Sequence, residues 1–344
     1  MIEVDFSPVP SARMRKVFVK RKQRLTVLGP SVDKFGHAWS QVHGEHSKLG
    51  HDLHLRPRFV YKDEPAPGDA SDRCLPDEQH RPPASRLVSP RGAVLRLYLT
   101  AVAEAQTRCR PGTRPVNSRP LVPTDGRETP AWVDLIASSA TPSRSGRTVM
   151  SVLDKKLRQL HTALGRLAEP GIRLVDLPHG QEPHGTYEEF QLLDEGGDRS
   201  VGEPISYRVP KPNETVFTIP TSLVTQGWIH VLEDTEITLL LMVACGRGSL
   251  PDEKPWIAIP GDTRLGHYGI GRDAFGHATL MLRRLGLLHI MEGSLRHLDG
   301  RVVDHREGEE PRLHRLKLNL DGFNQPAVQV LNEQLDYQLG RAAS

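Results

Sequence analysis

The feature that most constrains the fold of this chain is a pattern of elements that occurs twice. Each copy starts with an apolar helix-like run, then has a short helical segment, a turn rich in small residues and a third helix. In both copies the third helix ends on Leu-x-x-x-Gly followed by an apolar residue, at 167–172 and at 282–287. Such a glycine stops a helix in the left-handed conformation, and the apolar residue packs back on the last turn. The repetition predicts two similar folded units.

Each copy closes with two strand-like runs joined by a polar loop. The second pair alternates polar and apolar residues from Arg315 onward, as a half-buried strand does. The pattern predicts an α+β fold. Its expected helices lie at 93–103, 131–137 and 147–169 and at 236–244, 261–268 and 272–285, and its strands at 172–177, 189–193, 287–291 and 313–320.

Two polar segments rich in Pro or Gly, 61–86 and 196–215, bury too little apolar surface to order themselves and are predicted to be linkers. They define the expected organisation of the chain. It has an N-terminal arm at 1–60, a linker at 61–86, a first domain at 87–195, a linker at 196–215, a second domain at 216–322 and a helical tail at 323–344.

The formal charge of +3 hides a strong segregation of charge along the chain. Residues 1–60 sum to +6 and 81–173 to +10, whereas 174–261 sum to −9 and 262–344 to zero. Basic segments of this size favour a polyanion as partner.

The order helix, helix, turn, helix, hairpin resembles the winged helix-turn-helix family. The C-terminal copy resembles it most closely: Phe275 and 282–290 are similar to the junction between recognition helix and wing in many bacterial regulators. Its lead-in, 217–232, is similar to the start of such domains in actinobacterial plasmid and regulatory proteins. The resemblance implies two winged helix-turn-helix domains in tandem, preceded by the basic N-terminal arm. It also implies a transcription regulator or a plasmid replication initiator that binds double-stranded DNA without catalysis.

In the middle copy, the start of the third helix is the expected reader of the major groove. Arginine forms two hydrogen bonds with the edge of guanine, hydroxyl groups donate to phosphate, and nearby cations bind the DNA backbone. A solvated basic helix face is the alternative interpretation. The candidate residues are Arg144, Arg147, Thr148, Ser151, Lys155 and Arg158.

In the C-terminal copy the matching readers are Arg272 and His277, whereas Asp273 is expected to cap the helix. This copy is electrically neutral, so docking of a protein or dimerisation is the alternative. An interaction module with only the middle domain on DNA is therefore a rival hypothesis.

The N-terminal arm holds seven cations in the twelve residues 13–24. It is expected to follow phosphates or to lie in a minor groove, and a solvated tail is the alternative. The candidate contacts are Arg15, Lys16, Lys20, Arg21 and Lys22.

Other functional classes find less support in the sequence. His37, His43, His46, His51 and His54 suggest a zinc site, and hence a metal-dependent enzyme as second alternative, but neither H-E-x-x-H nor H-x-x-E-H occurs. We expect no cofactor and no catalysis, since the phosphate-binding loop and nucleophile-elbow motifs are absent.

The remaining expectations concern location and assembly. Three dispersed cysteines and apolar runs too short for a membrane span predict a cytoplasmic, nucleoid-associated protein without membrane contact. The leucines of 153–167 are spaced 4-3-4-3, so they form either a homodimer seam or part of their own domain's core.

Overall fold

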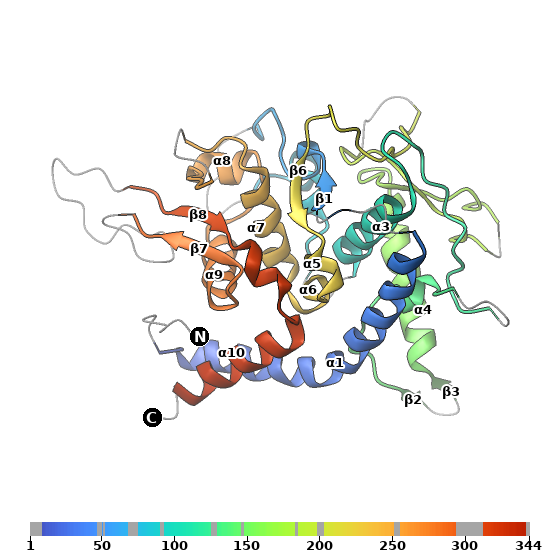
Figure 1. Cartoon of the computed structure of the whole chain (residues 1–344), viewed down its shortest axis with the longest axis horizontal. Coiled ribbons are helices and arrows are strands. Elements are labelled where there is room, and N and C mark those ends of the chain that lie inside the picture. Colours follow the sequence, from blue (N-terminus) through green and yellow to red (C-terminus); the bar gives the residue numbers. More distant parts are fainter. Residues whose placement is uncertain are drawn as a thin grey trace.

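The structure is a computed structural model of the chain. It describes residues 9–46, 50, 52–67, 75–89, 93–124, 129–145, 148–182, 185–197, 203–250, 255–293 and 312–341, with the backbone alone for 45, 46, 144, 145, 148 and 149. The fold is mixed α+β: about half of the described residues are helical, and the strands form small antiparallel sheets (Figure 1).

Helices supply most of the framework. The α-helices are α1 (Ala12–His46), α2 (Pro83–Arg86), α3 (Val94–Arg108), α4 (Val152–Ala168), α5 (Ser222–Thr225), α6 (Trp228–Val231), α7 (Asp234–Cys245), α8 (Gly261–Gly266), α9 (Arg272–Arg284) and α10 (Ala327–Arg341). Short 3-10 turns are η1 (Pro57–Phe59), η2 (Glu78–His80), η3 (Trp132–Leu135) and η4 (Leu320–Asn324).

The strands pair two by two, each time antiparallel. The pairs are β1 (Asp52–Leu55) with β6 (Phe217–Pro220), β2 (Ser143–Ser145) with β3 (Thr148–Met150), β4 (Val175–Asp176) with β5 (Gln191–Leu192), and β7 (Leu288–Met291) with β8 (Arg315–Leu318).

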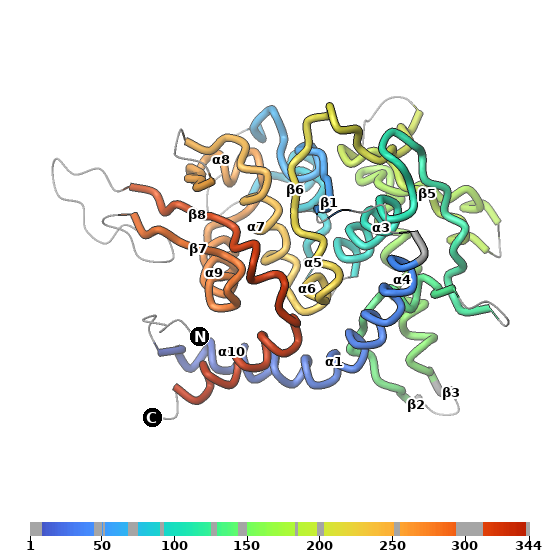
Figure 2. The backbone as a smooth tube through the Cα atoms, in the orientation of Figure 1, coloured from blue at the N-terminus to red at the C-terminus, as the bar shows by residue number. Residues whose placement is uncertain are grey.

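Helix α1 replaces the predicted arm with a rigid element of 35 residues. The buried positions of its inner face alternate three and four residues apart, which keeps one stripe of the helix toward its neighbours. Pro30 lies inside the helix, removes one backbone hydrogen bond and favours a bend, and α1 changes direction along its course (Figures 1 and 2). The buried stripe is Phe18, Arg21, Leu25, Leu28, Val32, Phe35, Trp39 and Val42.

Contacts hold α1 against both halves of the molecule. Its first half pairs Lys22 with Asp336 of α10, and α10 lies across it in Figure 1. Further along, the hydroxyl of Ser31 accepts the N–H of Ser138 at 3.0 Å. The tail helix, predicted at 323–344, is thus formed as α10, and it lies on α1 of the same chain.

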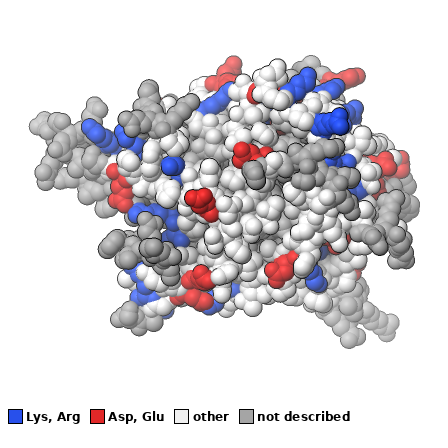
Figure 3. Space-filling model, viewed as in Figure 1, with Lys and Arg blue, Asp and Glu red and all other residues white. Residues whose placement is uncertain are grey.

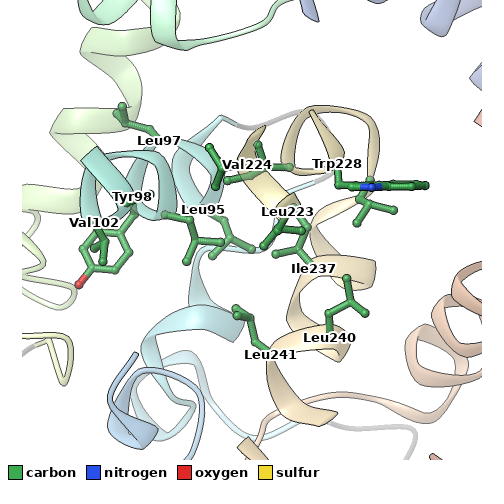
Figure 4. Close-up of a cluster of buried hydrophobic side chains, with 14 of the residues drawn as sticks. Leu95, Leu97, Tyr98, Val102, Leu223, Val224, Trp228, Ile237, Leu240 and Leu241 are labelled. Carbon is green, nitrogen blue, oxygen red and sulfur yellow. The ribbon is translucent and has the colours of Figure 1, made fainter. Parts of the chain in front are cut away.

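One continuous core joins the two predicted domains. Leu95 of α3 faces Leu223 of α5, and both belong to one apolar cluster with Tyr98, Ile237 and Leu241 (Figure 4). Strand β1 comes from the predicted arm and pairs with β6 of the second predicted domain. Separate cores are therefore replaced by a shared one. We call residues 93–197 the middle lobe and residues 234–318 the C-terminal lobe.

Both predicted linkers contain described residues that pack against the rest of the chain. In the first, the Lys62 N–H donates to the His267 carbonyl at 3.0 Å, and the Tyr61 ring stacks on the His267 ring at 4.9 Å. In the second, Tyr207 is buried and its N–H donates to the Leu192 carbonyl. The prediction that these segments bury too little surface to order themselves thus does not hold for Tyr61 and Tyr207, because each aromatic side chain packs on another part of the chain.

The C-terminal copy follows its predicted order of elements. Helices α7, α8 and α9 precede the β7–β8 hairpin, and Gly286 after α9 takes the left-handed conformation at φ 70°. The helix ends and strand ends differ from the prediction by a few residues.

The middle copy departs from the prediction in three places. The second helix is only the 3-10 turn η3, and the small-residue turn is the β2–β3 hairpin, so α4 begins five residues later than expected. Gly171 does not adopt the left-handed conformation, which Arg173 takes instead at φ 47°. Leu160, Leu164 and Leu167 of α4 are buried in the chain's own core, and Leu153 is exposed.

The buried Arg21 guanidinium donates to both carboxylate oxygens of the buried Glu236. We expect Arg21→Met to destabilise the protein by about 3–5 kcal/mol, because Glu236 is then left as an unpaired buried charge. Arg21→Met combined with Glu236→Gln should regain most of this loss, since the uncharged amide still accepts from the Glu233 N–H. Urea denaturation at pH 7 measures both. Lys22→Met is the matched control: it breaks an exposed pair on the same helix and should cost less than about 1 kcal/mol. Equal losses for Arg21→Met and Lys22→Met would contradict the assignment.

A buried histidine should make stability depend on pH. Burial lowers the pKa of His230 to about 3, and neither ring nitrogen has a hydrogen-bond partner among the described residues. The unfolded chain takes up a proton near pH 6.5 and the folded one does not. The contribution of His230 to stability should therefore fall on acidification below about pH 6.5, with a limiting slope of about 1.4 kcal/mol per pH unit.

His230→Phe should flatten that slope in urea titrations between pH 7 and pH 5, because phenylalanine keeps an aromatic ring against Phe35 and binds no proton. Asp234 changes the stability in the opposite direction with pH. Burial raises its pKa to about 6, so the folded chain binds this proton more tightly than the unfolded one, and the stability gained from it is lost as the pH rises through about 6. An unchanged slope in His230→Phe would contradict the prediction.

Candidate nucleic-acid interface

The C-terminal lobe arranges a helix and a hairpin side by side. Ile257, between α7 and α8, exchanges two backbone hydrogen bonds with Leu316 of β8, at 2.9 and 2.8 Å. This bridge ties the segment between α7 and α8 to the β7–β8 hairpin. Helix α9 buries Ala278 and Leu282 against the core, and it packs on α7 and β7.

The opposite face of α9 is polar and partly open to solvent. Asp273, His277 and Arg283 are exposed, and Arg272 and Arg284 are half-buried. Arg283 pairs with Glu292 at the end of β7, at 3.1 Å and with both side chains exposed, so this pair opens at little cost in free energy.

The start of α1 brings positive charge to this lobe. The Arg284 guanidinium lies 5.7 Å from the centre of the Phe18 ring, a cation–π contact between α9 and α1. Residues 9–32 contain seven cations and no acidic residue. Arg13, Lys16 and Lys20 are exposed on this stretch. Figure 3 shows Lys and Arg over the end of the molecule that carries β8, α9 and the start of α1, with acidic side chains among them. We call this surface, formed by 12–24, α9 and β7–β8, the basic end.

The predicted arm contacts divide into two groups at the basic end. Lys16 and Lys20 are exposed, Arg15 is half-buried, and Lys22 forms its ion pair with Asp336. Arg21 is a correction: it is 8% exposed, and its guanidinium donates to both carboxylate oxygens of Glu236 at 2.6 and 2.8 Å. The heptad stripe of α1 turns Arg21 inward, so it does not face a DNA partner.

The middle-lobe candidates lie apart from the basic end, around α4 (Figure 1). The Ser151 side chain caps α4: its hydroxyl accepts the Asp154 N–H at 3.1 Å and donates to the Asp154 carboxylate at 2.7 Å. That carboxylate also accepts the Ser151 N–H, and these bonds hold its pKa below the usual value. The prediction that Ser151 donates to phosphate is corrected to a role in capping.

The other middle-lobe candidates differ in environment. Lys155 donates to the Thr141 carbonyl at 2.5 Å, and Arg158 is exposed. Arg144 and Thr148 lie on β2 and β3, in strands rather than at the start of a helix. Arg147 lies outside the described residues.

A groove of about 800 Å³ runs beside α4. One wall is the outward face of α4, with Lys155 and Arg158, and the other wall is formed by residues from 78–89 together with Ala93 and Val94. We call it the α4 groove. Lys155 and Arg158, which were predicted to hold the DNA backbone, therefore line a groove with a second wall instead of a free ridge.

The α4 groove is tied to the C-terminal lobe by a buried contact. The Ser89 N–H donates to the Asp234 carboxylate at 3.1 Å, at the start of α7. Arg96 lies 3.3 Å from the same carboxylate, yet burial outweighs it and raises the Asp234 pKa to about 6.

Arg283, Arg284 and Lys317 belong to the basic end but were not predicted from the sequence, and neither was the helical conformation of 12–24. Residues 9–32 contain no acidic residue, and apolar residues in and after this stretch are spaced three and four apart. This pattern predicts a basic helix at the N-terminus instead of a flexible arm.

Two alternatives are addressed by local geometry. Within the described residues, no three His, Cys, Asp or Glu side chains come together as metal ligands, although His51 and the His46 side chain lie outside them. No helix in the described part of the chain is both long and apolar enough to span a bilayer.

Comparison with known proteins returns no match to this chain among protein-family models, curated proteins or solved structures.

Ser151→Ala should lower the free energy of unfolding by about 0.5–2 kcal/mol, because α4 loses its N-cap. Its DNA affinity should stay within twofold of that of the original chain, since the hydroxyl is occupied by Asp154. Denaturant titration and fluorescence anisotropy on the same preparations measure the two effects. Ser151→Asp, which retains a capping oxygen, should restore stability; a tenfold loss of DNA affinity in Ser151→Ala would contradict the capping role.

Proposed function

We propose that the chain is a sequence-specific, non-catalytic protein that binds double-stranded DNA through the basic end. The observation that carries the proposal is the juxtaposition of an exposed helix face, an antiparallel hairpin and a stretch of α1 free of acidic residues. The order α7, Ile257 bridge, α8, α9, β7–β8 is that of a winged helix-turn-helix, and we assign the C-terminal lobe to that architecture.

In this proposal each element has its own part in binding. Helix α9 enters a major groove, where His277 and Arg272 reach base edges and Arg283 reaches the sugar-phosphate backbone. The β7–β8 hairpin lies along the adjacent backbone, with Lys317 and Arg315 on its second strand. Lys16 and Lys20, on the rigid start of α1, bind phosphates and fix the orientation of the protein.

The middle lobe has the order α3, η3, α4, β4–β5, and we interpret it as a second, altered winged helix. A tandem arrangement of this kind fits a transcription regulator or a plasmid replication initiator. A DNA footprint on the replication origin of the plasmid or integrated element that encodes the chain separates the two roles. An initiator protects several repeated sites there.

The salt dependence of binding tests the phosphate contacts. We expect the affinity of the full chain for duplex DNA to fall steeply with salt, by about 0.9 in log–log slope for each phosphate neutralised. Lys16→Ala with Lys20→Ala should weaken binding to all sequences alike and should reduce the slope by about 2. Fluorescence anisotropy at several salt concentrations measures both quantities.

The matched control for this experiment is Arg110→Ala with Arg114→Ala. It removes the same charge from exposed positions of the middle lobe and should leave the slope unchanged. Whole-chain variants are needed because one core spans both lobes. A flat salt response of the original chain, or equal losses in both double variants, would sink the proposal.

Sequence specificity is tested by selecting bound fragments from genomic DNA. His277→Ala should lose about 1–3 kcal/mol of affinity for the selected site and little affinity for unrelated duplexes. Failure of any sequence to be enriched would contradict sequence-specific binding.

A further inference from the structure

The α4 groove has the size and the lining of a small-molecule site. Its volume of about 800 Å³ falls within the range of about 300–1,000 Å³ that is usual for ligand pockets. Its lining residues come from 78–94 and 140–169, and none belongs to the basic end. The groove is therefore separate from the surface proposed to bind DNA.

The charges around the groove favour an anionic ligand. Five cationic side chains and two carboxylates line it. Both carboxylates, Glu78 and Glu169, pair with Arg166, so their charge is directed at that one side chain. Arg81, Lys155 and Arg158 supply positive charge beyond these pairs. The Arg81 Nε is buried and has no hydrogen-bond partner among the described residues, so a ligand in the groove would be contacted by the other guanidinium nitrogens of Arg81.

Part of the remaining lining is apolar, and it lies beside the polar side chains of Ser85, Ser89, Gln159 and Thr162. Leu87, Val94 and Ala163 line the groove and are each less than a tenth exposed. Met150 and Ala140 extend this apolar part toward the end of α4 that carries Lys155. An apolar surface beside arginines accommodates a planar ring together with an anionic group, because a guanidinium both binds phosphate in a fork and stacks on rings.

We propose that the α4 groove binds a small organic phosphate of the nucleoside phosphate class. Arg81 and Arg158, from opposite walls, hold the phosphate, with Lys155 as a third charge at one end. The base or a comparable ring lies over Leu87, Val94 and Ala163. A rigid duplex is a poorer fit, since the two walls face each other across a cavity of small-molecule volume. The proposal stands independently of DNA binding.

Isothermal titration calorimetry on the full chain tests the proposal with ATP, AMP, adenosine and inorganic pyrophosphate as probes. We expect ATP and AMP to bind, and adenosine and pyrophosphate each to bind at least about tenfold more weakly, since each lacks half of the recognised chemistry. Arg158→Ala and Arg81→Ala should each weaken ATP binding by about tenfold or more.

Two further variants separate a specific site from general attraction by charge. Arg110→Ala removes the same charge from an exposed position outside the groove and should leave ATP affinity unchanged. Thr162→Tyr keeps the charge and fills the groove from the exposed face of α4, so it should abolish ATP binding. No heat of binding with ATP or AMP at millimolar concentration would overturn the proposal. So would equal losses in Arg110→Ala and Arg158→Ala, or undiminished binding in Thr162→Tyr. Circular dichroism verifies that each variant is folded.

Discussion

The buried ion pair between Arg21 and Glu236 fixes the position of α1, and the rest of the structure depends on that position. Burial of two charges is costly unless the geometry is good and the remaining hydrogen-bond groups are satisfied. Here two N–H groups reach the two carboxylate oxygens and a further bond joins Arg21 to the Val231 carbonyl at 3.2 Å, which leaves only the Arg21 Nε without a partner among the described residues. Glu236 also accepts the Glu233 N–H at the start of α7, so one carboxylate both caps α7 and orients α1.

The consequence of this pair is that positive charge lies where the primary sequence alone would not put it. The C-terminal segment 262–344 has no net charge of its own, yet its helix α9 lies beside the basic start of α1. A helix is a stiff support, and its exposed cations keep a fixed spacing relative to α9, unlike those of a tail. Charge and fold pattern, which are separated along the chain, meet at the basic end.

In the middle lobe the fold turns positive charge away from the open surface. This lobe is the most basic part of the sequence, but its third helix faces a wall formed by residues from 78–94, part of which was expected to be a linker. The cations of α4 are thereby turned toward a cavity. The same residue types that predicted contact with a duplex line a concave surface, and such a lining suits the compact anion that we propose as ligand.

The sequence by itself determined the α+β class, the helices α3, α7, α9 and α10, and the strand pairs β4–β5 and β7–β8. Periodicity and the glycine after α9 act locally, so a short window of residues contains their signal. The β2–β3 hairpin was missed because a three-residue strand rich in Ser and Arg has the composition of a turn. The tertiary structure alone decided that Arg21 is buried, that β1 pairs with β6 and that the lobes share a core. These contacts join residues more than a hundred positions apart, and such pairings depend on the packing of the whole chain.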